Sequence, residues 1–254
     1  MSMILTGYVL KAAVRDRLVI GMFIVMALAV SLSIFMGSAA LNEKDQFAAV
    51  FAAGSIRFLN VFGLCLFVVF FIRRSFESRD IEYMLTRPVS RVKFLMSYAA
   101  GLSIIALISG LFSGLCLYAM SPHLFSEGLI LWTLSMAVEN VIMMNAALFF
   151  AMILPSAATA SFAVLGLYVM GRMSGQILGI LDAQKHFMHF QGLEVTMESI
   201  SFFMPRLDLL AQTSWLIYGA EDGGVSYPFI LLLGIGYTGV LLLASIIDLI
   251  YRKF

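Results

Sequence analysis

Charged residues are scarce in this sequence. Asp, Glu, Lys and Arg make up only 12% of its 254 residues, about half of their share in an average soluble domain, whereas 61% of the residues are hydrophobic. A soluble fold of this length needs a larger polar surface to face water. The composition therefore excludes an ordinary soluble domain and indicates an integral membrane protein.

Neither sign of charge is in excess. The chain has 16 Lys and Arg against 15 Asp and Glu. This balance excludes the strongly basic surface with which proteins bind the phosphates of nucleic acids, so we expect no nucleic-acid partner. The positions of the charges along the chain are more informative than their sum.

Cysteines are few, and several catalytic motifs are missing. Cys65 and Cys116 both lie in apolar runs, where a thiol packs as a small apolar side chain. The chain has no GxxxxGK[ST] phosphate loop, no HExxH zinc motif and no Gly-x-Ser-Gly element of the rhomboid type. We therefore expect no enzymatic activity and no cofactor in this chain itself.

Two histidines are the one hint of a metal site. His186 and His189 are three residues apart, with Glu194 and Glu198 nearby, but no third ligand has the spacing that completes a site. Such a pair is typical of an amphipathic surface segment. We expect no metal.

Long apolar runs are abundant. A helix needs about 20 mostly apolar residues to cross the hydrocarbon layer. We predict an all-α integral membrane protein with six transmembrane helices, at residues 18–40, 56–72, 95–120, 129–153, 156–178 and 228–250. Residues 1–17 predict an N-terminal interfacial helix, with Ile4, Leu5, Tyr8 and Val9 on its apolar side.

The basic residues indicate an orientation. If the N-terminus faces the cytoplasm, eleven of the 16 Lys and Arg fall on the cytoplasmic side and five on the outer side. This asymmetry follows the positive-inside rule. We therefore predict a multi-pass protein of the inner, or cytoplasmic, membrane with both termini in the cytoplasm.

The connections between the predicted spans differ in length. The turns at 121–123 and 155–156 are short, so the third, fourth and fifth spans should be antiparallel neighbours. Residues 179–227 instead mix apolar side chains with charges. We predict that they form an outer re-entrant segment, with Trp215 and Tyr218 at the membrane interface.

The densest cluster of charges is RDIEYMLTRPVSR, residues 79–91. Ile81, Met84 and Leu85 share one face at helical spacing. Pro88 should end this helix because proline disfavours helical geometry in the residue before it. The pattern predicts a short amphipathic helix at residues 76–87 on the cytoplasmic surface.

The same stretch follows a known pattern. Glu77 precedes the run IEYML at 81–85, and Pro-Val-Ser-Arg at 88–91 comes directly before a span. In these motifs the chain resembles the coupling-helix region of ABC-2 type transporter permeases. The order of a surface helix, six spans and a re-entrant region before the last span is also similar. Pro205-Arg206-Leu207 followed by Trp215 is similar to an element of the family's outer segment.

The resemblance implies one ABC-2-like transmembrane domain, residues 1–254, that is the permease subunit of an ATP-driven ABC transporter, an exporter or a flippase. Two permease chains would pair as a homodimer in membrane lipid and dock two copies of an ABC ATPase subunit. ATP and Mg²⁺ would bind to that ATPase, and further periplasmic or membrane subunits could join.

The resemblance also implies which residues dock the ATPase: Glu77, Arg79, Asp80, Ile81, Glu82, Met84, Leu85, Arg87, Pro88 and Arg91. Judged without the family, the same stretch is equally compatible with an ordinary charged loop that obeys the positive-inside rule.

Polar groups inside the predicted spans form a second candidate site: Glu139, Asn140, Asn145, Arg172 and Asn60. A lone ionisable group at mid-bilayer costs about 2.5–3.5 kcal/mol on insertion scales. We therefore favour an ion pair between Glu139 and Arg172. The alternative is that the group, together with Arg57, faces a substrate path or the dimer seam.

Glycines recur at intervals of four in two spans. Gly171, Gly175 and Gly179 lie in the fifth span, and Gly110 and Gly114 in the third. Small residues at this spacing let helices approach closely. We favour packing within the chain, with the homodimer seam as the alternative.

A different functional class also fits the composition. The chain would then be a self-sufficient secondary transporter or channel that uses Glu139 as a proton or ion site. Transport driven by an ion gradient alone, without an ATPase, distinguishes this alternative from the ABC hypothesis.

Overall fold

The computed structural model describes residues 3–39, 44–78, 90–120, 122, 126–184, 204–219 and 225–251. In these ranges every regular element is helical. The long helices are α1 (Met3–Arg15), α2 (Arg17–Ala39), α3 (Lys44–Glu77), α5 (Arg91–Met120), α6 (Glu127–Ile153), α7 (Ala157–Gln184) and α10 (Tyr227–Tyr251). The short elements are the 3-10 helix η2 (Leu207–Leu209) and α9 (Trp215–Tyr218).

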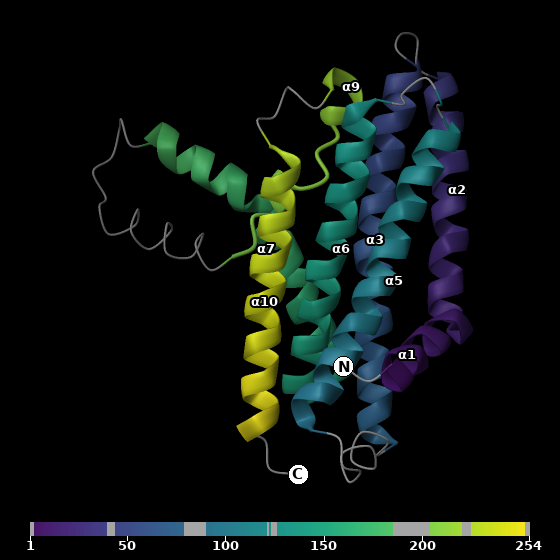
Figure 1. Ribbon diagram of the computed structural model, residues 1–254. Helices are drawn as coiled ribbons and strands as arrows, with labels where there is room; N and C mark the ends of the chain where they lie inside the picture. The colour runs from purple at the N-terminus through teal and green to yellow at the C-terminus, as the bar shows by residue number, and fades with distance from the viewer. Residues whose placement is uncertain are drawn as a thin grey trace.

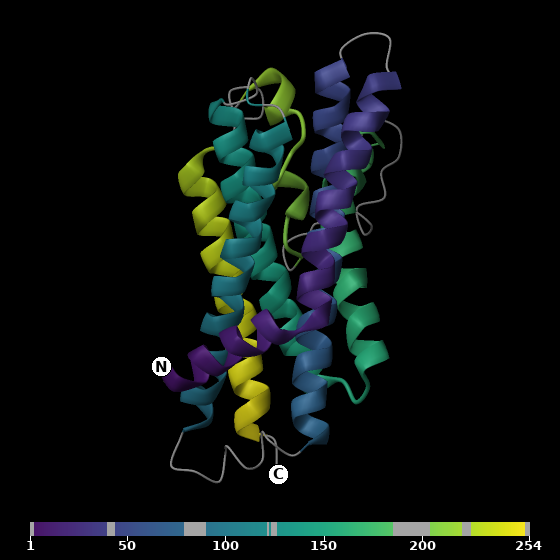
Figure 2. The same cartoon turned by 90° about the vertical axis from the view of Figure 1, so that its right-hand side faces the viewer.

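Five of these helices are long and apolar enough to cross a membrane, namely α2, α3, α5, α6 and α10. They run side by side in one bundle (Figure 1). Helix α1 lies across the end of the bundle where α10 finishes, and α9 lies at the opposite end (Figure 2). We call these the α1 end and the α9 end. The chain is therefore a helical membrane protein, as the composition predicted.

Helix α7 contains the fifth predicted span but is not among the five apolar helices. Arg172 and Ser174 interrupt its apolar sequence. The helix also runs six residues beyond the predicted span end at residue 178, to Gln184. Its last turns point away from the bundle (Figure 1). The predicted outer segment 179–227 therefore begins in helical conformation.

Helix α6 is the central helix of the bundle. It packs against α3, α5, α7 and α10, and most of its residues are buried. Two glycines of α5 make room for it: a Cβ atom on Gly110 would overlap Ala137, and one on Gly114 would overlap Thr133. These two glycines thus serve packing within the chain, as we favoured from their spacing.

Helix α1 packs against α5, and its buried residues are Thr6, Val9 and Ala13. The Thr6 hydroxyl donates a hydrogen bond to the carbonyl oxygen of Ser97 at 3.2 Å. Ile4, on the predicted apolar side, is 85% exposed. The chain turns at Asp16, whose carboxylate accepts the Leu18 N–H at 2.8 Å and caps the start of α2.

Helix α3 is 34 residues long and extends beyond the predicted span 56–72 in both directions. It begins at Lys44 because an alanine-rich stretch, with Ala48, Ala49, Ala52 and Ala53 buried, lets the helix pack closely against α2. A Cβ atom on Gly37 of α2 would lie only 2.7 Å from the Cβ atom of Ala48. Alanine is weakly apolar, so hydropathy alone does not reveal this packing.

At the α1 end, α3 continues to Glu77, and Ser78 N–H donates to the Arg74 carbonyl at 2.9 Å. The predicted start of a separate helix at residue 76 was therefore wrong. Neither proline nor glycine follows Ile72 before Glu77, so helix propagation is not interrupted there. The remainder of the predicted helix, residues 79–87, lies outside the described residues.

Candidate functional site: an arginine-bound segment inside the bundle

Residues 204–219 form a largely irregular segment that packs against the helices and reaches the α9 end of the bundle through α9 itself. Element η2 contacts α7, and α9 contacts α6 and α3. Four side chains of the segment have no exposed surface: Leu207, Leu210, Ala211 and Trp215. A chain that is not helical must find partners for its backbone groups when it is buried. Some of those partners lie within the segment, such as the Leu210 N–H that donates to the Leu207 carbonyl at 3.1 Å. Two arginines of the surrounding helices supply further donors to its carbonyl groups.

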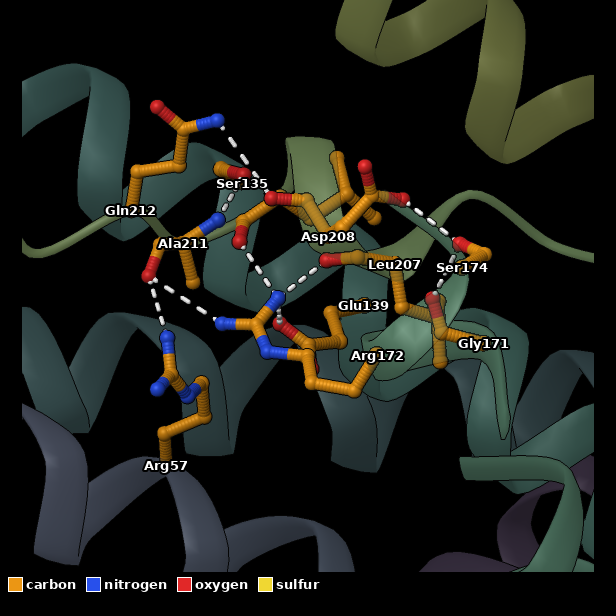
Figure 3. A network of polar contacts seen from close by, with 11 residues as sticks. Arg57, Ser135, Glu139, Gly171, Arg172, Ser174, Leu207, Asp208, Ala211 and Gln212 are labelled. Atoms are coloured by element: carbon orange, nitrogen blue, oxygen red, sulfur yellow. Dashed lines mark hydrogen bonds and ion pairs between the residues drawn. The ribbon is translucent and has the colours of Figure 1, made fainter. Parts of the chain in front are cut away.

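Arg172 of α7 binds three carbonyl groups at the end of η2. One of its terminal nitrogens, Nη1, donates to the carbonyl oxygens of Leu207 and, at 2.7 Å, Leu210. The other, Nη2, lies 3.5 Å from the carbonyl oxygen of Ala211. Figure 3 shows the guanidinium group pointing into this turn. Its planar fork of donors suits a turn whose carbonyls point the same way.

Arg57 of α3 points toward the same turn, beside Arg172 (Figure 3). Its Nη1 donates to the carbonyl oxygen of Ala211 at 2.6 Å, and the Ala211 N–H donates to the Ser135 hydroxyl at 2.6 Å. Ala211 has a φ of 46°, the single positive φ outside glycine in the described residues. A left-handed alanine costs about 1–2 kcal/mol, and the bonds from α3 and α6 hold it.

Glu139 of α6 supplies the negative charge of the site. Its Oε2 lies 3.8 Å from Arg172 Nη1, and the side chain has no exposed surface. The ion pair that we favoured from the sequence is therefore present. Neither carboxylate oxygen accepts a hydrogen bond from the described residues. Glu139 thus pairs with Arg172 by charge alone, while the hydrogen bonds of Arg172 go to carbonyl groups of the 204–219 segment.

A second charged pair lies within the segment itself. The Asp208 carboxylate accepts hydrogen bonds from Arg206 Nε at 3.1 Å and Nη2 at 2.9 Å. It also accepts the Ser174 hydroxyl of α7 at 2.8 Å. The side-chain hydrogen bond to Asp208 raises the pKa of the Arg206 guanidinium. Tyr237 of α10 donates to the Met204 carbonyl at 2.7 Å, so the start of the segment is also tied to α10.

Three glycines make room for this segment. A Cβ atom on Gly128 of α6 would overlap the carbonyl oxygen of Trp215, and one on Gly171 of α7 would lie 2.7 Å from the carbonyl oxygen of Pro205. A Cβ atom on Gly175 would overlap the Asp208 carboxylate. The run of glycines in α7 was predicted to let helices approach. At Gly171 and Gly175 it instead admits an irregular chain.

The three asparagines of the predicted site make different contacts. Asn60 bonds to the hydroxyl groups of Ser109 and Ser113 on α5. Asn145 donates to the Ser103 hydroxyl at 3.2 Å. The buried amide of Asn140 has no hydrogen-bond partner in the described ranges. Asn60 and Asn145 therefore join α3 and α6 to α5, and neither contacts the arginine-bound segment through a hydrogen bond.

The predicted ATPase-docking residues are described only at their two ends. Glu77 is the last residue of α3, and Arg91 is the first of α5. Arg91 Nη1 donates to the carbonyl oxygens of Leu249 and Ile250, at 2.9 and 3.3 Å. The others lie outside the described residues: Arg79, Asp80, Ile81, Glu82, Met84, Leu85, Arg87 and Pro88. His186 and His189 also lie outside them.

A second arginine at the α1 end was missed in the sequence. Arg73 of α3 donates to the carbonyl oxygens of Leu154, at 3.1 Å, and Pro155. These residues form the tight turn between α6 and α7. The sequence did contain a hint of this contact. Arg73 directly follows a predicted span, and the predicted turn at 155–156 follows a helix end with free carbonyl groups at the same side of the membrane.

In the comparisons with known proteins, this chain matches no family model and no curated protein sequence.

Proposed function

We propose that this chain is the membrane subunit of a transporter that a separate ATPase drives. Helix α7 would cross the membrane in addition to the five apolar helices, which gives six spans. Residues 79–89 would contain the element that docks the ATPase. The sequence motifs described above suggest the class. The contacts at the α1 end of the bundle supply the physical support.

The observation that carries the proposal is how the two ends of segment 79–89 are attached. On one side, Arg73 joins α3 to the turn between α6 and α7. On the other side, Arg91 joins the start of α5 to the end of α10. A force on the segment would therefore reach α6, α7 and α10 as well as the two helices that it connects.

The surface helix adds a third connection. Helix α1 packs on α5 near its start, with the Thr6 hydroxyl bound to the Ser97 carbonyl. A Cβ atom on Gly101 of α5 would lie 2.9 Å from the Cβ atom of Val9. Helices are stiff over this length, so a rotation of α5 would move α1 with it. The helices that meet at the α1 end would therefore move together when a bound partner changes conformation.

The rest of the proposal follows from this arrangement. The α1 end would face the cytoplasm of the cell's inner membrane, and two chains would pair as a homodimer. The ATPase would bind ATP and Mg²⁺ in two copies. Residues 204–219 would be the re-entrant segment in the outer half of the membrane, and the complex would be an exporter or a flippase.

Gradient-driven transport at Glu139 has weaker support. A proton or ion site must exchange with water, whereas Glu139 has no exposed surface and pairs with Arg172. These contacts favour a role in holding the 204–219 segment. Transport in proteoliposomes by this chain alone, in an ion gradient without ATP, would overturn our preference.

The test is copurification of the full-length chain with its ATPase from native membranes, read by mass spectrometry. We expect charge reversal of Glu77→Lys with Glu82→Lys to lower the recovered ATPase at least tenfold, with membrane insertion unchanged. The matched control reverses two acidic residues at the α9 end, Asp45→Lys with Glu127→Lys, and should retain the ATPase. Equal recovery from both variants, or no ATPase with the unmodified chain, would contradict the proposal.

A further inference from the structure

A groove of about 460 Å³ lies between α2 and α3 and takes no part in the site described above. Its walls are almost entirely apolar, with Gly21 and Val25 on α2 and Leu59, Phe62 and Leu66 on α3. Arg17, the first residue of α2, lines it at the α1 end of the bundle. The groove thus combines a long apolar wall with one cationic end.

Two glycines with opposite roles shape this groove. Nothing lies within 4 Å of a Cβ atom built on Gly21, so the missing side chain leaves open space. On the facing helix, a Cβ atom on Gly63 would lie 2.7 Å from the Met22 side chain. Met22 therefore fills the notch at Gly63 and brings the two helices together. The hollow remains beside that contact, at Gly21.

The dimensions fit one lipid chain in one leaflet. From Arg17 to Val25 the groove follows α2 for eight residue steps, about 12 Å at 1.5 Å per residue. Half of the hydrocarbon layer is about 15 Å thick. Val25 is 45% exposed and Phe62 37% exposed, so the walls face the hydrocarbon layer. The groove would hold the part of an acyl chain that is nearest to the headgroup, and the headgroup would lie at Arg17.

The charges select the headgroup. Lys11, Arg15 and Arg17 are exposed at this end. The nearest acid, Asp16, already accepts the Leu18 N–H at 2.8 Å. Neither of the ion pairs between described residues involves Arg17. Basic sites between helices at the membrane surface attract anionic lipid headgroups, and a Lys or Arg that contacts the headgroup contributes about fivefold in affinity. An anionic phosphate complements this site better than a zwitterionic headgroup.

We propose that the groove between α2 and α3 binds one anionic phospholipid, with its phosphate at Arg17 and one acyl chain between Gly21 and Phe62. The lipid would fill the hollow beside the Met22 contact and hold the start of α2 against α3. The proposal depends only on the membrane location of the bundle, and it holds whether or not the chain works with an ATPase.

The test is native mass spectrometry of the purified full-length chain, titrated with phosphatidylglycerol or with phosphatidylcholine of the same acyl chains. We expect one saturable phosphatidylglycerol adduct, with at least fivefold weaker binding of phosphatidylcholine. Arg17→Gln should lower the affinity for phosphatidylglycerol about fivefold, and Arg15→Gln, two residues away and outside the groove, should change it less than twofold.

A second pair of variants tests the acyl-chain site. Gly21→Leu should fill the open space and abolish the saturable adduct, whereas Gly236→Leu, made at another glycine with nothing within 4 Å, should leave it in place. Equal binding of both lipids to the unmodified chain would overturn the proposal. Equal losses from Arg17→Gln and Arg15→Gln would overturn it too, because they would indicate attraction by the surface charge in general.

Discussion

Arginine side chains bind backbone carbonyl groups in both halves of the bundle, but they hold different structures there. At the α1 end, Arg73 and Arg91 bind the carbonyl groups at the ends of α6 and α10. Such sites are favourable because a helix C-terminus carries free carbonyls and a partial negative charge. In the half nearer α9, Arg57 and Arg172 bind an irregular segment instead.

The difference lies in what the carbonyl groups would lose without the arginines. A helix end at the α1 end of the bundle can exchange an arginine for interfacial water. The turn at residues 207–211 is buried, with Leu207, Leu210 and Ala211 having no exposed surface. Non-helical backbone at membrane depth persists only where protein groups or a water-filled cavity satisfy it. Arg57 and Arg172 therefore supply donors to carbonyl groups of a turn that is buried from solvent.

The strongest way to sharpen this comparison is to remove the arginine that faces the buried acid. Arg172→Leu removes the ion-pair partner of Glu139 and the hydrogen bonds from Arg172 to three carbonyl groups. Among the described residues, the Leu210 carbonyl is then left without a donor. We expect a loss of about 3–5 kcal/mol in the free energy of unfolding, as for other broken buried pairs. Equilibrium unfolding in detergent measures it. A loss below about 1 kcal/mol would contradict the central role of Arg172.

The second variant acts on the space that the segment occupies. Gly128→Ala places a methyl group on the Trp215 carbonyl, and backbone cannot move aside as a flexible side chain can. We expect a loss of about 3 kcal/mol, the upper range for overpacking. Gly166→Ala on α7, where nothing lies within 4 Å, is the control and should be neutral or slightly stabilising. Equal effects of the two would indicate a general intolerance of alanine.

The third variant tests the α1 end. Arg73→Leu removes the donor for Leu154 and Pro155 but leaves no buried acid behind. We expect a loss of about 2 kcal/mol, in the range for hydrogen bonds to charged groups, and therefore less than for Arg172→Leu. The same unfolding assay compares the two directly. An equal or larger effect at Arg73 would remove the distinction between the two ends.

The smallest effect is expected where no charge is involved. Asn60→Ala removes the hydrogen bonds from α3 to Ser109 and Ser113 of α5. Hydrogen bonds between transmembrane helices average about 0.6 kcal/mol, so we expect a loss near 1 kcal/mol for the pair. A loss above about 3 kcal/mol would place the main polar support of the bundle here and not at Arg172.

The membrane-crossing helices were largely predictable because the bilayer fixes their length. The predicted spans 18–40 and 228–250 differ from α2 and α10 by a single residue at each end. Helix α3 was predicted too short at both ends. Its first turns are held by close packing of small residues against α2, and no hydropathy scale contains that contact.

Of the candidate site, only the pairing of its charged side chains could be predicted from the sequence. A buried acid needs a partner, so Glu139 and Arg172 could be paired from the sequence. The larger role of Arg172 was not visible, because its other partners are backbone carbonyl groups, which every residue carries. Ser135 gave no signal for the same reason: its partner is the N–H of Ala211.

The central claim is that Arg57 and Arg172 hold residues 207–211 inside the bundle, and cysteine accessibility tests it most directly. In a chain with Cys65 and Cys116 replaced by Ala, we expect Leu210→Cys to resist a membrane-impermeant maleimide, while Tyr218→Cys, at a position 70% exposed, reacts. Adding Arg57→Gln, Arg172→Gln and Glu139→Gln together, which leaves no unpaired buried charge, should make Leu210→Cys react within tenfold of the Tyr218→Cys rate. Continued protection of Leu210→Cys in that background, or its rapid labelling in the chain with both arginines intact, would contradict the account.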